Sequence, residues 1–194
     1  MLLLVGLGNP GAEYAWNRHN VGFMVAERIR QSLPGAPAFR EKFSGEIAKG
    51  TLEGCEVVVL RPLTFMNLSG RSVQRAAAFF QVPVGDIVVV HDDLDLPFKA
   101  VRVKLGGGTG GHKGLKSVTE QLGSSDYMRV RLGIGRPAHG SAEDYVLSDF
   151  DEMETRELEA VVERATRAVA CIVTKGVQRT MNEFNTKEAP EEDA

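Results

Sequence analysis

The stretch LLLVGLGNPG at residues 2–11 opens the chain and is the starting point for predicting its fold. Its apolar half, residues 2–7, has the length and composition of a buried strand. Glycine and proline then end the strand, and polar sequence continues until an amphipathic pattern predicts a helix over residues 20–33. The opening unit is therefore a strand, a loop and a helix.

Strand and helix patterns alternate through the rest of the sequence. Apolar or alternating runs predict strands at residues 43–49, 55–60, 87–90, 101–105 and 128–134. Amphipathic spacing predicts helices at residues 69–80, 112–122 and 152–175. We therefore expect an α/β fold, a single-domain three-layer sandwich with a mixed, mostly parallel twisted sheet flanked by helices.

The chain has 194 residues, the size of one domain, with 43% hydrophobic and 25% charged residues. These values exclude a wholly disordered chain. We expect one catalytic domain over residues 1–187, followed by a disordered acidic tail at residues 188–194. No apolar run approaches the roughly 18 residues of a membrane span, and no basic leader precedes the first one. A cytoplasmic protein without a membrane partner is expected.

Charge is unevenly distributed, although the formal net charge is only -3. Residues 143–159 hold eight acids and one base, and residues 188–194 hold four acids, which leaves a net +8 elsewhere. Within residues 99–136, eight bases stand against two acids. Such a segment suits a phosphate backbone, although its bases could equally pair with the acidic segment.

Two glycine-rich segments only partly match nucleotide-binding loops. GLGNPG at residues 6–11 fits GxGxxG, but no helix follows at once and no second strand ends in an acid about 20 residues later. GGGTGGHK at residues 106–113 lacks the Lys-Ser or Lys-Thr pair of a Walker A loop. A dinucleotide cofactor and nucleotide hydrolysis are therefore disfavoured. We expect the glycines to form a loop that moves over a cleft.

Polar residues gather in four loops that follow predicted strands, at residues 8–19, 64–69, 91–95 and 106–112. If these strands end at one edge of the sheet, the loops converge on one cleft. There His19 could take a proton from water while Asp92 orients its ring. Asn9 and Asn67 could donate hydrogen bonds to a carbonyl oxygen that gains negative charge. This set is suited to hydrolysis of an acyl bond.

A metal-dependent hydrolase is the main alternative. The sequence offers possible zinc or manganese ligands in His19, His91, Asp92, Asp93 and His112. It contains no compact ligand pair such as HExxH, and no GxSxG elbow that would favour a serine nucleophile. Direct attack by water, without a metal or another cofactor, is the simpler mechanism.

Several longer motifs occur in order along the chain. They are VGLGNPG at 5–11 with Tyr14, RHNVG at 18–22, RPLTFMNLSG at 61–70, HDDLDLPF at 91–98, RVKLGGG at 102–108 and GGHKGLKS at 110–117. In these motifs the chain resembles the bacterial-type peptidyl-tRNA hydrolases, from Leu2 to about Phe184. The resemblance implies a monomeric enzyme that cleaves the ester between a peptide and the 3′ ribose of tRNA, which frees the tRNA for reuse in translation.

The resemblance also implies roles for individual residues. It makes His19 the catalytic histidine, Asp92 its orienting partner and Asn9 a further catalytic residue. For substrate and tRNA binding it points to Tyr14, Met66, Asn67, Lys104, His112, Lys113 and Arg131. Lys104 and Arg131 would hold the 5′ phosphate of the tRNA, next to its acceptor stem and 3′ end.

Two positions depart from the family pattern. Lys113 stands where an asparagine is usual, so an amide acceptor is lost and a positive charge is gained. We expect retained activity with altered binding. Asn17 replaces a usual threonine, with little expected consequence. A related fold could also serve only as an RNA-binding scaffold, but the intact Asn9, His19 and Asp92 argue against that role.

Overall fold

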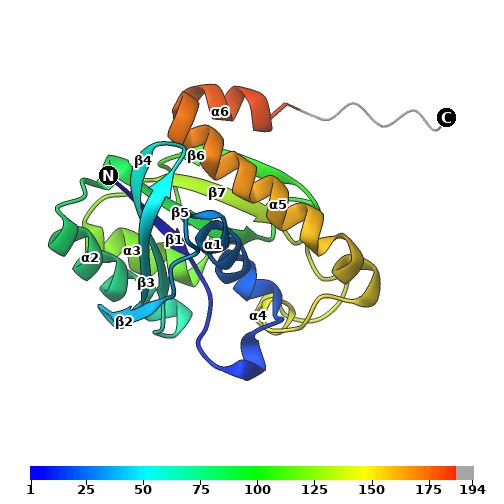
Figure 1. The fold of residues 1–194 in the computed structure, drawn as a ribbon. Coiled ribbons are helices and arrows are strands. Elements are labelled where there is room, and N and C mark those ends of the chain that lie inside the picture. The colour runs from blue at the N-terminus through cyan, green and yellow to red at the C-terminus, as the bar shows by residue number, and fades with distance from the viewer. Residues whose placement is uncertain (187–194) are drawn as a thin grey trace.

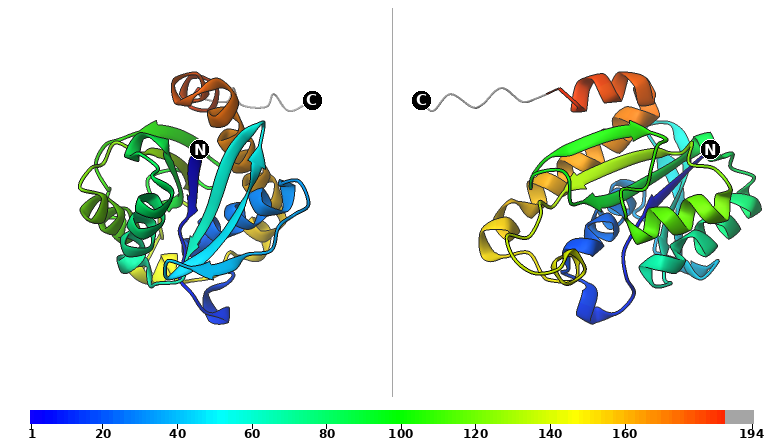
Figure 2. Two further views of the ribbon diagram at one scale, coloured as in Figure 1. Left: turned by 60° about the vertical axis from the view of Figure 1, so that its left-hand side comes forward. Right: turned by 180° about the vertical axis from the view of Figure 1, so that it is seen from behind.

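The computed structural model describes residues 1–186, which form one seven-stranded mixed sheet with helices on both faces (Figures 1 and 2). In sheet order the strands are β2 (Arg40–Lys42), β3 (Gly45–Leu52), β4 (Cys55–Pro62), β1 (Leu2–Gly6), β5 (Ile87–Asp93), β7 (Met128–Gly133) and β6 (Val101–Leu105). The four strands β4, β1, β5 and β7 are parallel, whereas the β2–β3, β3–β4 and β6–β7 pairs are antiparallel. The expected mixed, mostly parallel sheet is confirmed.

Alternate side chains of the central strands build a core on each face of the sheet. On one face, Leu4 and Val90 pack with α1 (Val21–Ser32) and α5 (Glu152–Lys175). On the other face, Leu3 and Val89 pack with α2 (Ser69–Phe80) and α3 (Lys113–Leu122). The three layers of the predicted sandwich follow from this two-sided burial.

Several short elements were not predicted from the sequence. They are β2, α4 (Ala142–Val146), α6 (Val177–Phe184) and the 3-10 helices η1 (Ala12–Tyr14), η2 (Arg18–Asn20), η3 (Met66–Leu68) and η4 (Val84–Asp86). Apart from α6, whose two turns are amphipathic, these elements give too few periods for a clear pattern, and their ends depend on tertiary contacts. Among the described residues, no helix is long and apolar enough to cross a bilayer. The predicted acidic tail, residues 188–194, lies outside the described part of the chain.

The glycine loop reaches the cleft by a different route from the one we expected. Because β6 is antiparallel to β7, its carboxyl end lies at the opposite edge of the sheet from the ends of β1 and β5. The loop begins there, where the Gly106 N–H donates to the Tyr127 carbonyl at 3.0 Å. It then runs back along β7 and brings His112 to Asp92 near the far end of β5. The convergence of loops is correct, but for this loop the strand-end argument is wrong.

Candidate active site

One cleft of about 860 Å³ contains all ten residues that were predicted for catalysis or binding. They are Asn9, Tyr14, His19, Met66, Asn67, Asp92, Lys104, His112, Lys113 and Arg131. The cleft lies past the carboxyl ends of β1 and β5, and the glycine loop and α4 contribute further walls. Segments from most of the chain length therefore meet at one site.

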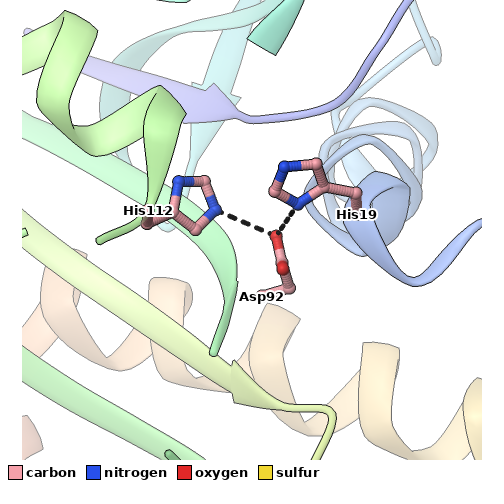
Figure 3. A group of neighbouring side chains, drawn as sticks. All are labelled: His19, Asp92 and His112. Atoms are coloured by element: carbon pink, nitrogen blue, oxygen red, sulfur yellow. Dashed lines mark hydrogen bonds and ion pairs between the residues drawn. The ribbon is translucent and has the colours of Figure 1, made fainter. Parts of the chain in front are cut away.

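Asp92 lies between two histidines at the floor of this cleft (Figure 3). Its Oδ1 is 2.8 Å from Nδ1 of His19 and 3.0 Å from Nε2 of His112. The side chain of Asp92 is only 2% exposed, and both imidazoles are 9% exposed. The structure thus confirms the predicted proximity of His19 and Asp92, and adds His112 as a second partner of the same oxygen.

Hydrogen-bond partners indicate which nitrogens of these rings hold protons. Nδ1 of His112 accepts from the N–H groups of Gly114 and Leu115, at 3.1 and 3.3 Å, and so caps α3. The proton of a neutral His112 therefore sits on Nε2 and is donated to Asp92. Likewise, a His19 that donates from Nδ1 to Asp92 keeps the lone pair of Nε2 for a proton from the cleft.

The charge on Asp92 is stabilised by its neighbours. Burial by itself would raise the pKa of the Asp92 carboxyl, but His19 and His112 outweigh burial and hold that pKa well below its usual range. His91 shows the opposite balance: burial, and then the nearby His112, lower its pKa to about 3. A carboxylate and a neutral histidine therefore stand side by side on β5.

Close backbone packing places His19 beside Asp92. A Cβ on Gly22 would lie 2.5 Å from the carbonyl oxygens of Leu7 and Val90. Only glycine lets the first turn of α1 sit this tightly against β1 and β5. Because η2 directly precedes α1, this contact brings His19 over the end of β5.

Asn20 and Met66 hold Asn9 in place. The backbone N–H of Asn9 donates to Oδ1 of Asn20 at 2.9 Å, and Nδ2 of Asn20 donates to the Asn9 carbonyl at 3.0 Å. The N–H of Met66 donates to Oδ1 of Asn9 at 2.8 Å. With its oxygen bonded to the Met66 N–H, the Asn9 amide can offer its NH2 group to the cleft. Asn67 is exposed on the same cleft.

Basic side chains occupy the part of the cleft over β7 and β6. Lys104 and Arg131 both line it, and Nε of Arg131 is 2.7 Å from Oδ2 of Asp93. Arg129 is 2% exposed and donates to the carbonyls of Gly107 and Gly108, at 2.6 and 2.7 Å. These bonds tie the first half of the glycine loop to the sheet, and the expected motion of the loop over the cleft stays a prediction.

The acidic segment neutralises little of this basic patch. Of the eight bases within residues 99–136, only Lys99 and Lys113 pair with acids of residues 143–159 in the described structure. The Lys113 ammonium pairs with Glu143 of α4 across the cleft, and both side chains are more than half exposed. The alternative that these bases merely match the acidic segment therefore applies to two of them.

Three possible ligand atoms, one each from His19, Asp92 and His112, lie within 4.8 Å of one another, close enough to bind a metal ion. A metal would need a lone pair from each imidazole nitrogen that faces it. In the observed arrangement, Nε2 of His112 is a donor because its Nδ1 is occupied by two backbone N–H groups. The hydrogen-bond pattern therefore fits a His–Asp pair better than a metal site.

Some important residues were not identified from the sequence, or were not given their role. Arg18 and Asn20 flank the histidine, and Arg129 lies within the basic segment, but their tasks depend on what their side chains meet. Their signals in the sequence are the RHNVG motif, which contains Arg18 and Asn20, and the basic segment, which contains Arg129.

Together, the fold and the site define an α/β enzyme that can activate water with a histidine–aspartate pair beside a cationic rim. The family model for peptidyl-tRNA hydrolase matches residues 3–192. The peptidyl-tRNA hydrolase of Geotalea uraniireducens is 47% identical over 186 residues, which cover 96% of this chain and 97% of that protein. The Sorangium cellulosum enzyme of the same name is 48% identical over 193 residues, which cover 98% and 86%.

A solved structure agrees with these sequence matches. The crystal structure of peptidyl-tRNA hydrolase from Acinetobacter baumannii has a TM-score of 0.88 and 35% identity, covering 97% of this chain and 96% of that one. The chain therefore belongs to the peptidyl-tRNA hydrolase family. It is a carboxylic ester hydrolase that acts on peptidyl-tRNA.

Proposed function

We propose that His19 activates the water that cleaves the ester between the peptide and the 3′ ribose of tRNA. Nε2 of His19 takes a proton from water, and the water oxygen bonds to the ester carbonyl carbon. The resulting oxyanion collapses, the bond to the ribose oxygen breaks, and the proton on His19 passes to that oxygen. The products are a free 3′-hydroxyl and a peptide carboxylic acid. The observation behind this proposal is the buried His19–Asp92 hydrogen bond at 2.8 Å.

Two asparagines are proposed to stabilise the oxyanion. The amide NH2 of Asn9 is held toward the cleft, because its oxygen is bonded to the Met66 N–H. Asn67 offers a second, exposed amide on the same wall. Preorganised donors of this kind contribute several kcal/mol to a transition state. Tyr14 and Met66 supply wall surface for the peptide and the terminal nucleoside.

The cationic side of the cleft is proposed to bind the acceptor stem. Lys104 and Arg131 would hold the 5′ phosphate, and Lys113 would face backbone phosphate near the 3′ end. Phosphate contacts add affinity without reading base sequence, so many different tRNAs could be accepted. Because both nitrogens of His112 are occupied by Asp92 and the backbone, we assign His112 to the support of Asp92.

We further propose that the enzyme works as a monomer in the cytoplasm, without a metal or another cofactor. All ten proposed site residues come from one chain and line one cleft, so a second copy is not needed to complete it.

The decisive experiment is release of N-blocked aminoacyl groups from bulk tRNA by the wild type and His19→Ala, each with and without a chelator. We expect chelator-resistant release that His19→Ala lowers by about 10²- to 10⁴-fold. Chelator-sensitive release would instead indicate a metal site. Tight tRNA binding without release in the wild type would favour an RNA-binding scaffold.

A further inference from the structure

The residue before His19 is Arg18, whose buried side chain does not line the cleft. Arg18 is 6% exposed. Its Nη1 donates to Oγ of Ser148 at 2.8 Å and also contacts the carbonyls of Ser148 and Asp149. Its Nη2 pairs with Glu154 in the first turn of α5. One guanidinium therefore joins the 3-10 turn η2 to residues 148–154.

Further contacts at the same place reinforce this connection. The guanidinium carbon of Arg18 lies 4.3 Å from the ring centroid of Tyr145 and 5.4 Å from that of Phe150. The backbone N–H of Arg18 donates to the Ser148 carbonyl at 3.0 Å. Nδ2 of Asn17 donates to Oδ1 of Asp149 at 2.7 Å, and Asn17 is itself buried. Residues 17 and 18 are therefore bonded to the segment that follows α4, residues 148–154.

The residues just before that segment, at the end of α4, form one wall of the cleft. Val146 and Leu147 line the cleft, and the Tyr145 hydroxyl donates to the Ile134 carbonyl at 2.6 Å. Within one short turn, Arg18 therefore holds the α4 wall, while the next residue, His19, bonds to Asp92.

We propose that Arg18 is a positioning residue for hydrolysis, which keeps the His19 imidazole on Asp92 by anchoring its turn to residues 145–154. This inference rests on the proposed role of His19 as the base. Lysine cannot replace the arginine fully, because a single ammonium lacks the planar fork that contacts Ser148, Asp149 and Glu154 at once and stacks on Tyr145. A displacement of about 1 Å in a catalytic group can lower the rate by roughly 100-fold.

The test measures kcat and KM for Arg18→Lys, Arg18→Ala and a matched control, Arg28→Ala. Arg28 also joins the N-terminal part of the chain to α5, through Glu159 and Glu163, but it is 36% exposed and has no contact with η2 in the described structure. We expect Arg18→Lys to lower kcat by about 10- to 100-fold with KM changed less than about threefold. Arg28→Ala should stay within about twofold of the wild type, as expected for an exposed ion pair.

A double-mutant cycle separates positioning from general destabilisation. If Arg18 acts through His19, Arg18→Lys should cause little further loss of kcat in a His19→Ala background. The NMR signal of the His19 Nδ1 proton should also shift or broaden in Arg18→Lys. Should Arg18→Ala fail to fold, Arg18→Lys and the milder Ser148→Ala, which removes one acceptor, still provide the test.

The outcomes distinguish this proposal from the mechanism on which it rests. Wild-type kcat in folded Arg18→Lys, or an equal loss of kcat with and without His19, would overturn the role of Arg18. An inactive His19→Ala would in that case still support the mechanism. Full activity of His19→Ala would overturn the base itself, and the positioning role with it.

Discussion

Two regions of the same cleft use charge in different ways. The buried cluster consists of His19, His91, Asp92 and His112, whose side chains are almost fully buried. The Asp92 carboxylate bonds to His19 and His112 at 2.8 and 3.0 Å, and His91 donates to the Asp92 backbone carbonyl at 2.7 Å. The cationic rim consists of Lys104, Lys113 and Arg131. There the side chain of Arg131 is 25% exposed and that of Lys113 is 58% exposed.

This difference in burial predicts different consequences for substitution. In the cluster, water cannot replace a lost partner, so a change alters protonation and ring orientation and acts on the chemical step. In the rim, water and salt screen each charge, so a change acts mainly on tRNA affinity and its salt dependence. Substitutions in the two regions test this contrast, from the largest expected effect to the smallest.

Asp92→Asn should have the largest effect, a loss of about 10²- to 10⁴-fold in kcat, because the amide removes the charge that both histidines share. Asp93→Asn is the matched control: it changes the adjacent residue of β5, whose partner is Arg131. Its kcat should stay within about threefold. Equal loss in the two variants, measured by release from tRNA, would show that the contrast between the regions is wrong.

His91 should make stability depend on pH. Its pKa is lowered to about 3 in the fold, so the unfolded chain binds the extra proton between about pH 6.5 and pH 3, and stability rises with pH across that window. Through His91 alone, the free energy of unfolding of the wild type should fall by about 2 kcal/mol when the pH is lowered from 7 to 5.

His91→Asn should remove that part of the pH dependence, because an amide does not titrate in this range. The asparagine can still donate to the Asp92 backbone carbonyl that His91 bonds at 2.7 Å, so the fold should be kept. Denaturant unfolding of both proteins at pH 7 and pH 5 measures the difference. Parallel pH profiles would mean that His91 does not titrate as its burial implies.

Arg131→Ala should raise KM for peptidyl-tRNA by about tenfold and leave kcat nearly unchanged. The slope of the logarithm of the binding constant against the logarithm of the salt concentration should fall by about one, the share of one phosphate contact. Lys104→Ala should act in the same direction. Arg136→Ala serves as a control, because Arg136 is a more exposed base paired with Asp95 at the edge of the cleft. A drop in kcat with constant KM for Arg131→Ala would place that residue in the chemistry instead.

The smallest effect is expected at Lys113, since an exposed ion pair contributes only about 0–1 kcal/mol. Lys113→Asn should keep its turnover but bind tRNA a few times more weakly, with a shallower salt dependence. Glu143→Gln, which frees the lysine from its partner, should act in the opposite direction. Identical kinetics and salt slopes in Lys113→Asn and the wild type would show that this residue does not contribute to binding.

Much of the fold follows from local sequence. The apolar runs that form β1, β4 and β5, and the amphipathic spacing of α1, α2, α3 and α5, reflect burial on one or both sides, which is a short-range pattern. The short elements β2 and α4 escaped prediction because so few residues show no clear period. The eight residues of α6 do have apolar side chains at helical spacing, at Val177, Met181 and Phe184, and this short pattern was missed. The direction of β6 was also hidden, because alternation reports which face is buried and says nothing of which way a neighbouring strand runs.

The sequence by itself determined the strand and helix pattern, the family motifs and the ten residues that were expected at the site. Tertiary structure alone decided that Asp92 meets two histidines, that Arg129 holds the glycine loop, that Arg18 grips residues 145–154 and that Lys113 pairs with Glu143. The physical reason is that hydrogen bonds and ion pairs act over a few ångströms. Which residues come that close depends on strand order, register and helix packing, and these are properties of the whole chain.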